Sequence, residues 1–330
     1  MYRSTSSIKT KSINRRNNLT QSLNTKKLEI LNPNITKNLD FNFQQRNYAQ
    51  PIGQIRRTTD DCQVVVVTSG KGGVGKTTTA ASLALGLADK GYKTCAIDFD
   101  IGLRNLDLHL GCERRVVYDF VNVIQKECKL HQAAIKDKQN AHLFLLAAST
   151  VRDKSVLTEE GVGEVIDQLR KEFDYVVCDS PAGIENGAFQ AMYFADQAVI
   201  CTNPEISSVR DSDRMIGIIA SKSDRARKNL DVQQHLLITR YNPKRVAQED
   251  MLNVNSIEEM LGIPLVGVVP ECQSVLTSTN LGRPVIAEDS SNIAGKAYRD
   301  FVDRFLGEDK PLRFLEDQQE SWWKRLFSRN

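Results

Sequence analysis

The feature that most constrains this chain is the run of residues 70–77, which reads Gly-Lys-Gly-Gly-Val-Gly-Lys-Thr. It matches the pattern G-x-x-x-x-G-K-[ST]. Four valines at 64–67 precede it, and a segment with helical spacing of apolar residues follows at 76–90. Glycines in such a loop let backbone N–H groups turn toward phosphate oxygens, and the following helix adds the positive end of its dipole. The run therefore predicts a strand, a phosphate-binding loop and a helix, in that order.

The loop predicts binding of ATP with Mg²⁺. Lys76 would neutralise the β- and γ-phosphates, and the Thr77 hydroxyl would be a ligand of Mg²⁺. The predicted nucleotide-binding residues of this segment are Gly70, Lys71, Gly72, Gly73, Val74, Gly75, Lys76, Thr77 and Thr78.

The remainder of the body alternates short apolar runs with segments of helical length. The strand candidates are residues 64–67, 94–97, 143–146, 175–178, 198–201, 236–238 and 265–269. Such alternation predicts a single α/β domain of the P-loop class, with a mostly parallel twisted sheet and helices on both faces. Because ligands of these sheets bind at the carboxyl ends of the strands, we expect the site at that edge.

Carboxylates follow two further predicted strands. Asp98 and Asp100 end the second strand, and Asp179 begins the sequence Asp-Ser-Pro-Ala-Gly after the strand at 175–178. A lone Asp at a strand end is most often a cap or turn residue. Both positions, however, fall at the sheet edge where the phosphate loop is predicted, which favours a role in the same site.

Lys71 adds a second lysine to the loop and makes the pattern K-G-G-x-G-K-T. In this deviant Walker A motif the chain resembles the MinD/ParA superfamily. The resemblance implies a homodimer formed with ATP, in which Lys71 reaches the phosphates of the partner subunit. It also implies a catalytic set of Lys71, Lys76 and Asp100, with Asp100 positioning the attacking water. A metal set of Thr77, Asp98 and Asp179 would hold Mg²⁺.

From Asp98 onward the resemblance narrows to the MinD family of division-site ATPases. The matching segments are residues 98–107, 111–119, 202–205, 210–214, 239–243 and 269–271. The resemblance covers about four-fifths of the chain, from Val64 to the C-terminus.

Two further sets of residues are implied by this resemblance. Asn242, Pro270 and Glu271 would line the adenine pocket. A helix with Arg210, Asp211 and Asp213 would face MinC-like and MinE-like partners, although charged residues on a helix are most often its solvated face. Cys272 stands where the resemblance leads us to expect an acidic residue, which puts one contact to the base in doubt.

Residues 1–57 differ in composition from the body. Residues 1–60 hold 11 Lys and Arg against 3 Asp and Glu, and they show no sustained apolar period. We expect a disordered extension that resembles a mitochondrial or plastid transit peptide. The segment Arg46-Asn47-Tyr48-Ala49 resembles a matrix processing site, which favours the mitochondrial matrix, at the inner membrane, over the plastid stroma and inner envelope. The alternative is a disordered extension without function.

The C-terminal segment holds both tryptophans of the chain. Trp322 and Leu326 are four residues apart, as are Trp323 and Phe327, so a helix would place them on one apolar stripe beside Lys324 and Arg325. An aromatic stripe with a basic rim is typical of a helix lying on an anionic lipid surface, and it resembles the membrane-targeting helix of the MinD family. The alternative is a final helix that docks on its own core.

These patterns predict three parts: an organelle-targeting extension at 1–57, an ATPase domain at 58–309 and an amphipathic membrane helix at 310–330. The predicted function is an ATPase that dimerises with ATP, cycles on a membrane and positions the division site of an organelle. A ParA-type DNA-segregation ATPase is one rival, but residues 61–330 carry 33 Lys and Arg against 38 Asp and Glu, so nucleic acid is not expected. An iron–sulfur scaffold ATPase is another, and the seven scattered cysteines form no C-x-x-C pair, which favours buried free thiols.

Overall fold

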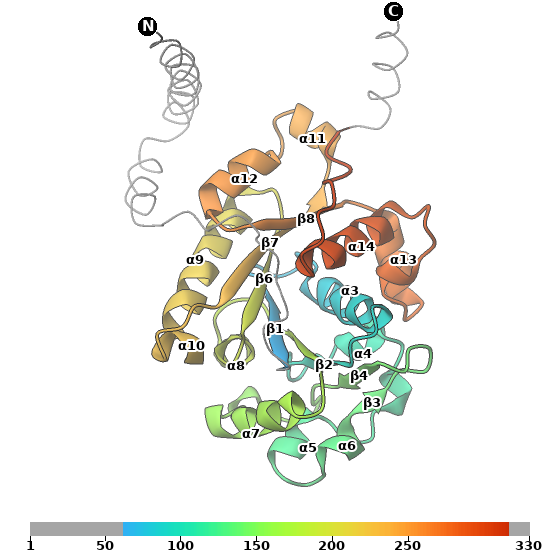
Figure 1. The fold of residues 1–330 in the computed structure, drawn as a ribbon, viewed down its shortest axis with the longest axis vertical. Helices are drawn as coiled ribbons and strands as arrows, with labels where there is room; N and C mark the ends of the chain where they lie inside the picture. The colour runs from blue at the N-terminus through green and yellow to red at the C-terminus, as the bar shows by residue number, and fades with distance from the viewer. Residues whose placement is uncertain (1–61, 317–330) are drawn as a thin grey trace, which may run out of the picture. The chain divides into compact units, whose positions relative to one another are not determined.

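The computed structural model describes residues 62–316. Within this range, one sheet has the strand order β3-β4-β2-β5-β1-β6-β7-β8 (Figure 1). Its strands are β1 (Gln63–Thr68), β2 (Thr94–Asp98), β3 (Ile135–Lys136), β4 (Leu143–Leu146), β5 (Tyr175–Asp179), β6 (Gln197–Thr202), β7 (Gln233–Tyr241) and β8 (Leu265–Pro270). Every neighbouring pair is parallel except β3 with β4. The predicted α/β fold with a mostly parallel sheet is confirmed.

Helices cover both faces of the sheet, as predicted (Figure 1). One face packs against α5 (Phe120–Ile124), α6 (Leu130–Ala133), α7 (Glu159–Arg170), α8 (Asn186–Tyr193), α9 (Ile206–Lys222) and α12 (Val254–Leu261). The other packs against α3 (Lys76–Asp89), α4 (Leu106–His109) and α14 (Ile293–Phe305). The remaining short elements are α10 (Asp224–Arg227), α11 (Pro243–Ala247), α13 (Gln273–Asn280), η1 (Glu113–Arg115), η2 (Lys154–Val156) and η3 (Val285–Ala287).

The valine run of β1 explains why this strand is central. Val64 and Val66 belong to the core on the α7–α9 face, whereas Val65 and Val67 belong to the core on the α3–α14 face. Successive side chains of a strand point to opposite faces, so only a strand covered on both sides is apolar at every position. β1 therefore lies between β5 and β6, and it delivers the phosphate loop to the middle of the sheet edge.

Strand β3 was not predicted from the sequence. It has two residues and pairs antiparallel with β4 at the edge of the sheet, Ile135 opposite Leu145 and Lys136 opposite Phe144. A two-residue strand is too short to leave a period in the sequence.

The last described residues, 310–316, are not helical. Arg304 of α14 donates hydrogen bonds to the carbonyl oxygens of Lys310 and Pro311, and Arg313 forms an ion pair with Asp300 at 3.0 Å. Residues 310–316, the beginning of the segment predicted as a membrane helix, therefore pack on the domain without helical structure.

Two predicted segments fall outside the described residues: the targeting extension at 1–57, and Trp322, Trp323, Lys324, Arg325, Leu326 and Phe327. In residues 62–316 no helix has both the length and the apolar character needed to cross a membrane.

Candidate functional site

The phosphate loop joins the carboxyl end of β1 to the first residue of α3. Gly73 and Gly75 have φ values of +74° and +90°, in the region that favours glycine. A Cβ built on either residue would meet no atom within 4 Å, so the loop has open space beside it. The first turn of α3 contains no acidic residue, which leaves the positive end of its dipole unopposed. This cradle fits a phosphate group.

Lys76 lies inside the loop and is buried. Its Nζ donates to the Ser69 hydroxyl at 3.1 Å, and that hydroxyl donates to the carbonyl oxygen of Lys71 at 2.7 Å. Burial lowers the pKa of Lys76, and the nearby Asp179 carboxylate is the largest opposing influence. The ammonium is thus held beside the loop and the carboxylates, where a phosphate would be its natural partner.

Asp98 and Asp179 occupy matching positions at the ends of neighbouring strands β2 and β5. Burial raises the pKa of Asp98 to about 6. Burial, together with the charge of Asp98, raises the pKa of Asp179 well above its usual range. Two buried carboxylates side by side destabilise each other's charged form, and a bound divalent cation would relieve that cost.

The free acceptor of this pair is Asp179. Its Oδ1 is buried without a hydrogen-bond partner among the described residues, and the nearby Thr77 hydroxyl lowers the pKa that burial raises. Residues 62–316 contain no ready-made cluster of three His, Cys, Asp or Glu for a metal. A cation here would therefore complete its ligand set with phosphate oxygens and water, as Mg²⁺ commonly does. Thr77 and Asp179 fit that arrangement.

Asp98 is engaged differently. Its Oδ1 accepts from the backbone N–H of Asp100 at 2.8 Å, and its Oδ2 accepts from the N–H groups of Asn105 and Leu106, each at 3.0 Å. In this structure Asp98 holds the loop that carries the half-buried Asp100. Its part in metal binding stays a prediction.

Lys71 is directed to α9 within the same chain. Its Nζ lies 3.0 Å from Oε2 of Glu205, the residue before α9, and 3.2 Å from the hydroxyl of Ser207. Both Lys71 and Glu205 are substantially exposed, with 43% and 47% of their side-chain surfaces accessible. Sequence reasoning missed Glu205 and Ser207. The available signal was that Glu205 closely follows the carboxyl end of a predicted strand.

The three predicted adenine residues come together at the ends of β7 and β8. Pro270 ends β8 and is buried, and the Asn242 side-chain amide donates to Glu271 Oε2 at 3.3 Å. The backbone N–H of Glu271 donates to the carbonyl oxygen of Tyr241 at 2.9 Å. Cys272 faces its neighbour in α13, with its Sγ 2.9 Å from the Ser274 hydroxyl. Contact of these residues with a base stays a prediction.

The predicted partner residues lie on α9 in unequal settings. Arg210 is exposed, whereas Asp211 and Asp213 are half-buried. Asp211 lies directly against the phosphate loop, because a Cβ at Gly70 would collide with its Cβ and backbone. Of the three, Arg210 has the surface most open to another protein.

Thr78 and the cysteines complete the set of predicted residues. The Thr78 hydroxyl lies 3.4 Å from Nε2 of His109 in α4. All seven cysteines are free, five are buried, and Cys128 and Cys272 are half-buried. Burial raises the pKa of Cys62 and of Cys201 to about 12, so these thiols are not reactive nucleophiles.

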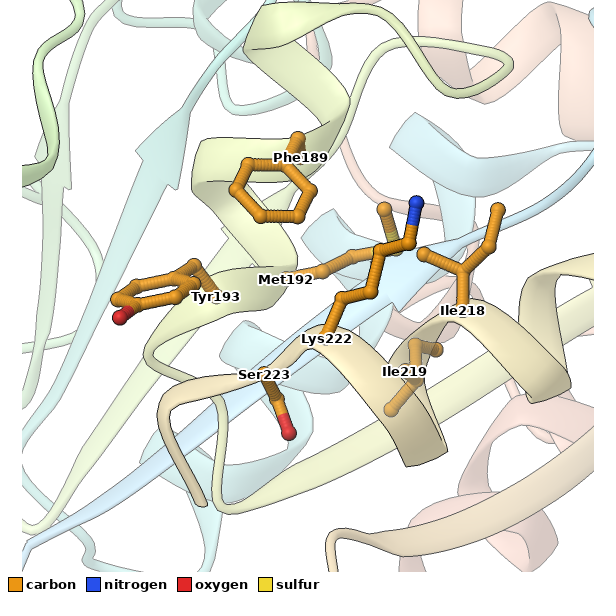
Figure 2. Close-up of a pocket in the computed structure, with 7 residues that line it drawn as sticks. All are labelled: Phe189, Met192, Tyr193, Ile218, Ile219, Lys222 and Ser223. Carbon is orange, nitrogen blue, oxygen red and sulfur yellow. The ribbon is translucent and has the colours of Figure 1, made fainter. Parts of the chain in front are cut away.

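A separate hollow lies between α8 and α9 (Figure 2). Helices that connect parallel strands run opposite to them, so the last turns of α8 and α9 lie toward the amino ends of the strands, away from the phosphate loop. The hollow is lined by Phe189, Met192, Tyr193, Ile218, Ile219, Lys222 and Ser223. It lacks the carboxylates of the phosphate-loop edge, and it is not the candidate site.

Comparison with known proteins places this geometry in a family. The model of a family described as an AAA domain matches residues 62–232. The septum site-determining protein MinD of Escherichia coli (strain K12) is 60% identical over 267 residues, which cover 80% of this chain and 98% of the relative.

Solved structures agree with the sequence comparison. MinD in the Aquifex aeolicus MinC:MinD cell division protein complex is 38% identical, with a TM-score of 0.67, and covers 78% of this chain and 100% of that one. The Pyrococcus horikoshii septum site-determining protein MinD, solved with Mg-ADP, is 26% identical, with a TM-score of 0.65, and covers 74% of this chain and 96% of that one.

Proposed function

Because this chain belongs to the MinD family of septum site-determining ATPases, we propose that it hydrolyses ATP in a Mg²⁺-dependent cycle of dimerisation and membrane binding that positions a division site. One observation carries the proposal. The phosphate loop, the buried ammonium of Lys76 and the carboxylates of Asp98, Asp100 and Asp179 all lie at the carboxyl edge of one sheet.

The residues of this edge have distinct tasks. The loop amides and Lys76 bind and neutralise the β- and γ-phosphates. Thr77 and Asp179 would hold Mg²⁺, which would supply positive charge to the phosphate oxygens. Asp98 fixes the loop of Asp100, and Asp100 orients the attacking water.

Dimerisation gives Lys71 its role. A cation supplied by a second subunit stabilises the transferring phosphoryl group only when two subunits meet. In the single chain Lys71 is bound to Glu205 and Ser207, so dimerisation would require it to leave α9. Such an exchange of partners would couple hydrolysis to formation of the dimer.

The membrane and partner parts of the proposal depend on sequence and family. The aromatic and basic residues at 322–327 would form an amphipathic helix that binds anionic lipid, and the two such helices of a dimer would bind more tightly than one. Arg210 and its neighbours on α9 would face MinC-like and MinE-like partners, since an Aquifex aeolicus relative was solved as a MinC:MinD complex. The basic extension at 1–57 would direct the chain to the mitochondrial matrix, peripheral on the inner membrane, or else to the plastid stroma and inner envelope.

Liposome co-sedimentation of the full chain tests the membrane cycle. We expect more protein to sediment with anionic vesicles in ATP and Mg²⁺ than in ADP. Trp323→Glu should abolish sedimentation because it places a charge on the apolar stripe, and it should leave nucleotide binding intact. If Trp323→Glu sedimented as much as the unmodified chain does, the proposed membrane helix at 322–327 would be contradicted.

Asp100→Ala separates binding from hydrolysis. We expect it to bind ATP normally but to turn ATP over roughly 100-fold more slowly, because the water loses its orienting carboxylate. Single-turnover hydrolysis on vesicles checks the rate, and the variant should accumulate there with bound ATP. A normal rate would remove Asp100 from the catalytic set.

A further inference from the structure

We propose that Thr239 is a positioning residue of the phosphate loop and that it ties this loop to the start of α9. Thr239 is buried near the carboxyl end of β7. Its hydroxyl donates to the carbonyl oxygen of Val74 at 2.7 Å, across 165 residues of sequence. The inference rests on the proposed function, because it assigns a further residue to the same nucleotide site.

The bond to Val74 fixes one peptide unit of the loop. In a trans peptide the C=O of Val74 and the N–H of Gly75 point in opposite directions. Holding the carbonyl against β7 therefore turns the Gly75 N–H away from β7 and orients it for a phosphate oxygen. Gly75 has a φ of +90°. Because a glycine in that conformation has little steric restraint of its own, the loop gains orientation from an external bond.

Strand β7 is irregular where it carries Thr239. Its pairing with β8 shifts register between Ile238 and Tyr241, and Arg240 has a φ of +53°. Bulges re-aim side chains beside functional sites, and a non-glycine residue at positive φ is retained where the surroundings require it. The irregular stretch includes Thr239, which contacts the phosphate loop, and it ends just before Asn242, which contacts Glu271. One strand end thus serves both the phosphate side and the predicted base side of the site.

Thr239 also belongs to a buried polar network that reaches α9. The same hydroxyl lies 3.0 Å from Oδ1 of Asn203 and 3.4 Å from the carbonyl oxygen of Thr202, so its single proton is shared among three acceptors, of which the Val74 carbonyl is the nearest. The backbone N–H of Asn203 donates to the Ser208 hydroxyl at 3.1 Å, and that hydroxyl lies 3.0 Å from the hydroxyl of Thr202. All four residues are buried, and Ser208 lies in the first turn of α9. Buried networks of this kind act as units rather than as separate bonds.

A second contact also joins the phosphate loop to α9. The backbone of Asp211 in α9 abuts Gly70 at the start of the loop. The phosphate loop is therefore held to α9 at both ends, by close packing at Gly70 and by the Thr239 network at Val74. A displacement of α9 would therefore also displace the phosphate loop. The segments 202–205 and 239–243 thus have a defined role, which is to hold the phosphate loop to α9.

A Thr239 series on the full chain tests the assignment. We expect Thr239→Val to weaken Mg-ADP binding by about tenfold in calorimetry, because the isosteric side chain removes only the hydroxyl. Thr239→Ser keeps the hydroxyl and should stay within about twofold of the unmodified chain.

Thr94→Val is the matched control. Thr94 is a buried strand threonine that donates to the carbonyl oxygen of Tyr92 at 3.0 Å, at the amino end of β2. It should lower the melting temperature as Thr239→Val does, but leave ADP affinity unchanged. Equal ADP affinity in Thr239→Val and Thr94→Val would overturn the positioning role.

Ser208→Ala tests the link to α9. It also provides the test of the assignment if Thr239→Val does not fold. We expect a several-fold loss of ADP affinity, and the double variant should bind no more weakly than Thr239→Val alone. Fully additive losses, or unchanged binding in Ser208→Ala, would overturn the link to α9. Failure of the unmodified chain to bind ADP would instead contradict the proposed function, and the inference with it.

Discussion

Lys76→Ala is expected to reduce the affinity for Mg-ADP by roughly 30- to 150-fold. The replacement removes the buried ammonium of the phosphate loop, and charge-assisted hydrogen bonds to phosphate are worth roughly 2–3 kcal/mol. It also leaves Asp179 without the nearest positive charge that lowers its pKa. Isothermal titration calorimetry measures the loss directly.

Lys171→Ala is the control for this prediction, because Lys171 is an exposed residue that follows α7. It should bind ADP as the unmodified chain does. If the ADP affinity of Lys76→Ala were within about threefold of the ADP affinity of Lys171→Ala, the loop would not bind phosphate as proposed.

Asp179→Asn should abolish ATP turnover and at the same time stabilise the nucleotide-free domain at pH 7.5, because it removes a buried carboxylate whose charged form is disfavoured by desolvation. The ionised carboxylate is buried beside Asp98, and its Oδ1 has no described hydrogen-bond partner to lose. An amide oxygen can still accept from the Thr77 hydroxyl. The melting temperature should therefore rise by several degrees while activity disappears.

The direction of this predicted change in stability follows from the pKa values of Asp98 and Asp179. Asp98 and Asp179 have folded pKa values raised above the ordinary Asp value, Asp98 to about 6. Their contribution to stability is present below the ordinary value near 4 and is lost as pH rises through the folded pKa values. Without nucleotide and metal, the contribution of these two carboxylates to stability should fall from pH 4.5 to 7.5, and Asp179→Asn should remove its share of that loss from the measured pH dependence. Asp167→Asn, at an exposed carboxylate on α7, is the matched control for the substitution. A destabilised Asp179→Asn at pH 7.5 would be inconsistent with a costly buried charge.

The sequence predicted those features that depend on residues close to one another along the chain. Val64–Val67 is apolar at every position because β1 is covered on both faces, so its place at the sheet centre could be predicted. The loop glycines and the strand-end carboxylates also follow short-range rules, and the structure brings Lys76, Asp98 and Asp179 to one edge.

Contacts between distant segments could not be predicted in this way. Lys71 meets Glu205 across 134 residues, and Thr239 meets Val74 across 165. Neither pair leaves a periodic signal, because each depends on how two strand ends are aligned in the finished sheet. The two oxygens of Asp98 accept three backbone N–H groups of its own loop, a contact that the sequence did not indicate, while its part in metal binding stays a prediction. A carboxylate after a strand looks the same in sequence whether it binds an ion or caps a turn.

The most direct test of the account is the molar mass of the full chain by light scattering, with Mg²⁺ and either ATP or ADP. Asp100→Ala is the suitable form, since slow turnover would preserve bound ATP during the measurement. We predict twice the mass of one chain with ATP and the mass of one chain with ADP, and Lys76→Ala should remain single in both. A mass that stays that of one chain with saturating ATP would contradict the claim that hydrolysis depends on a lysine supplied by a second subunit.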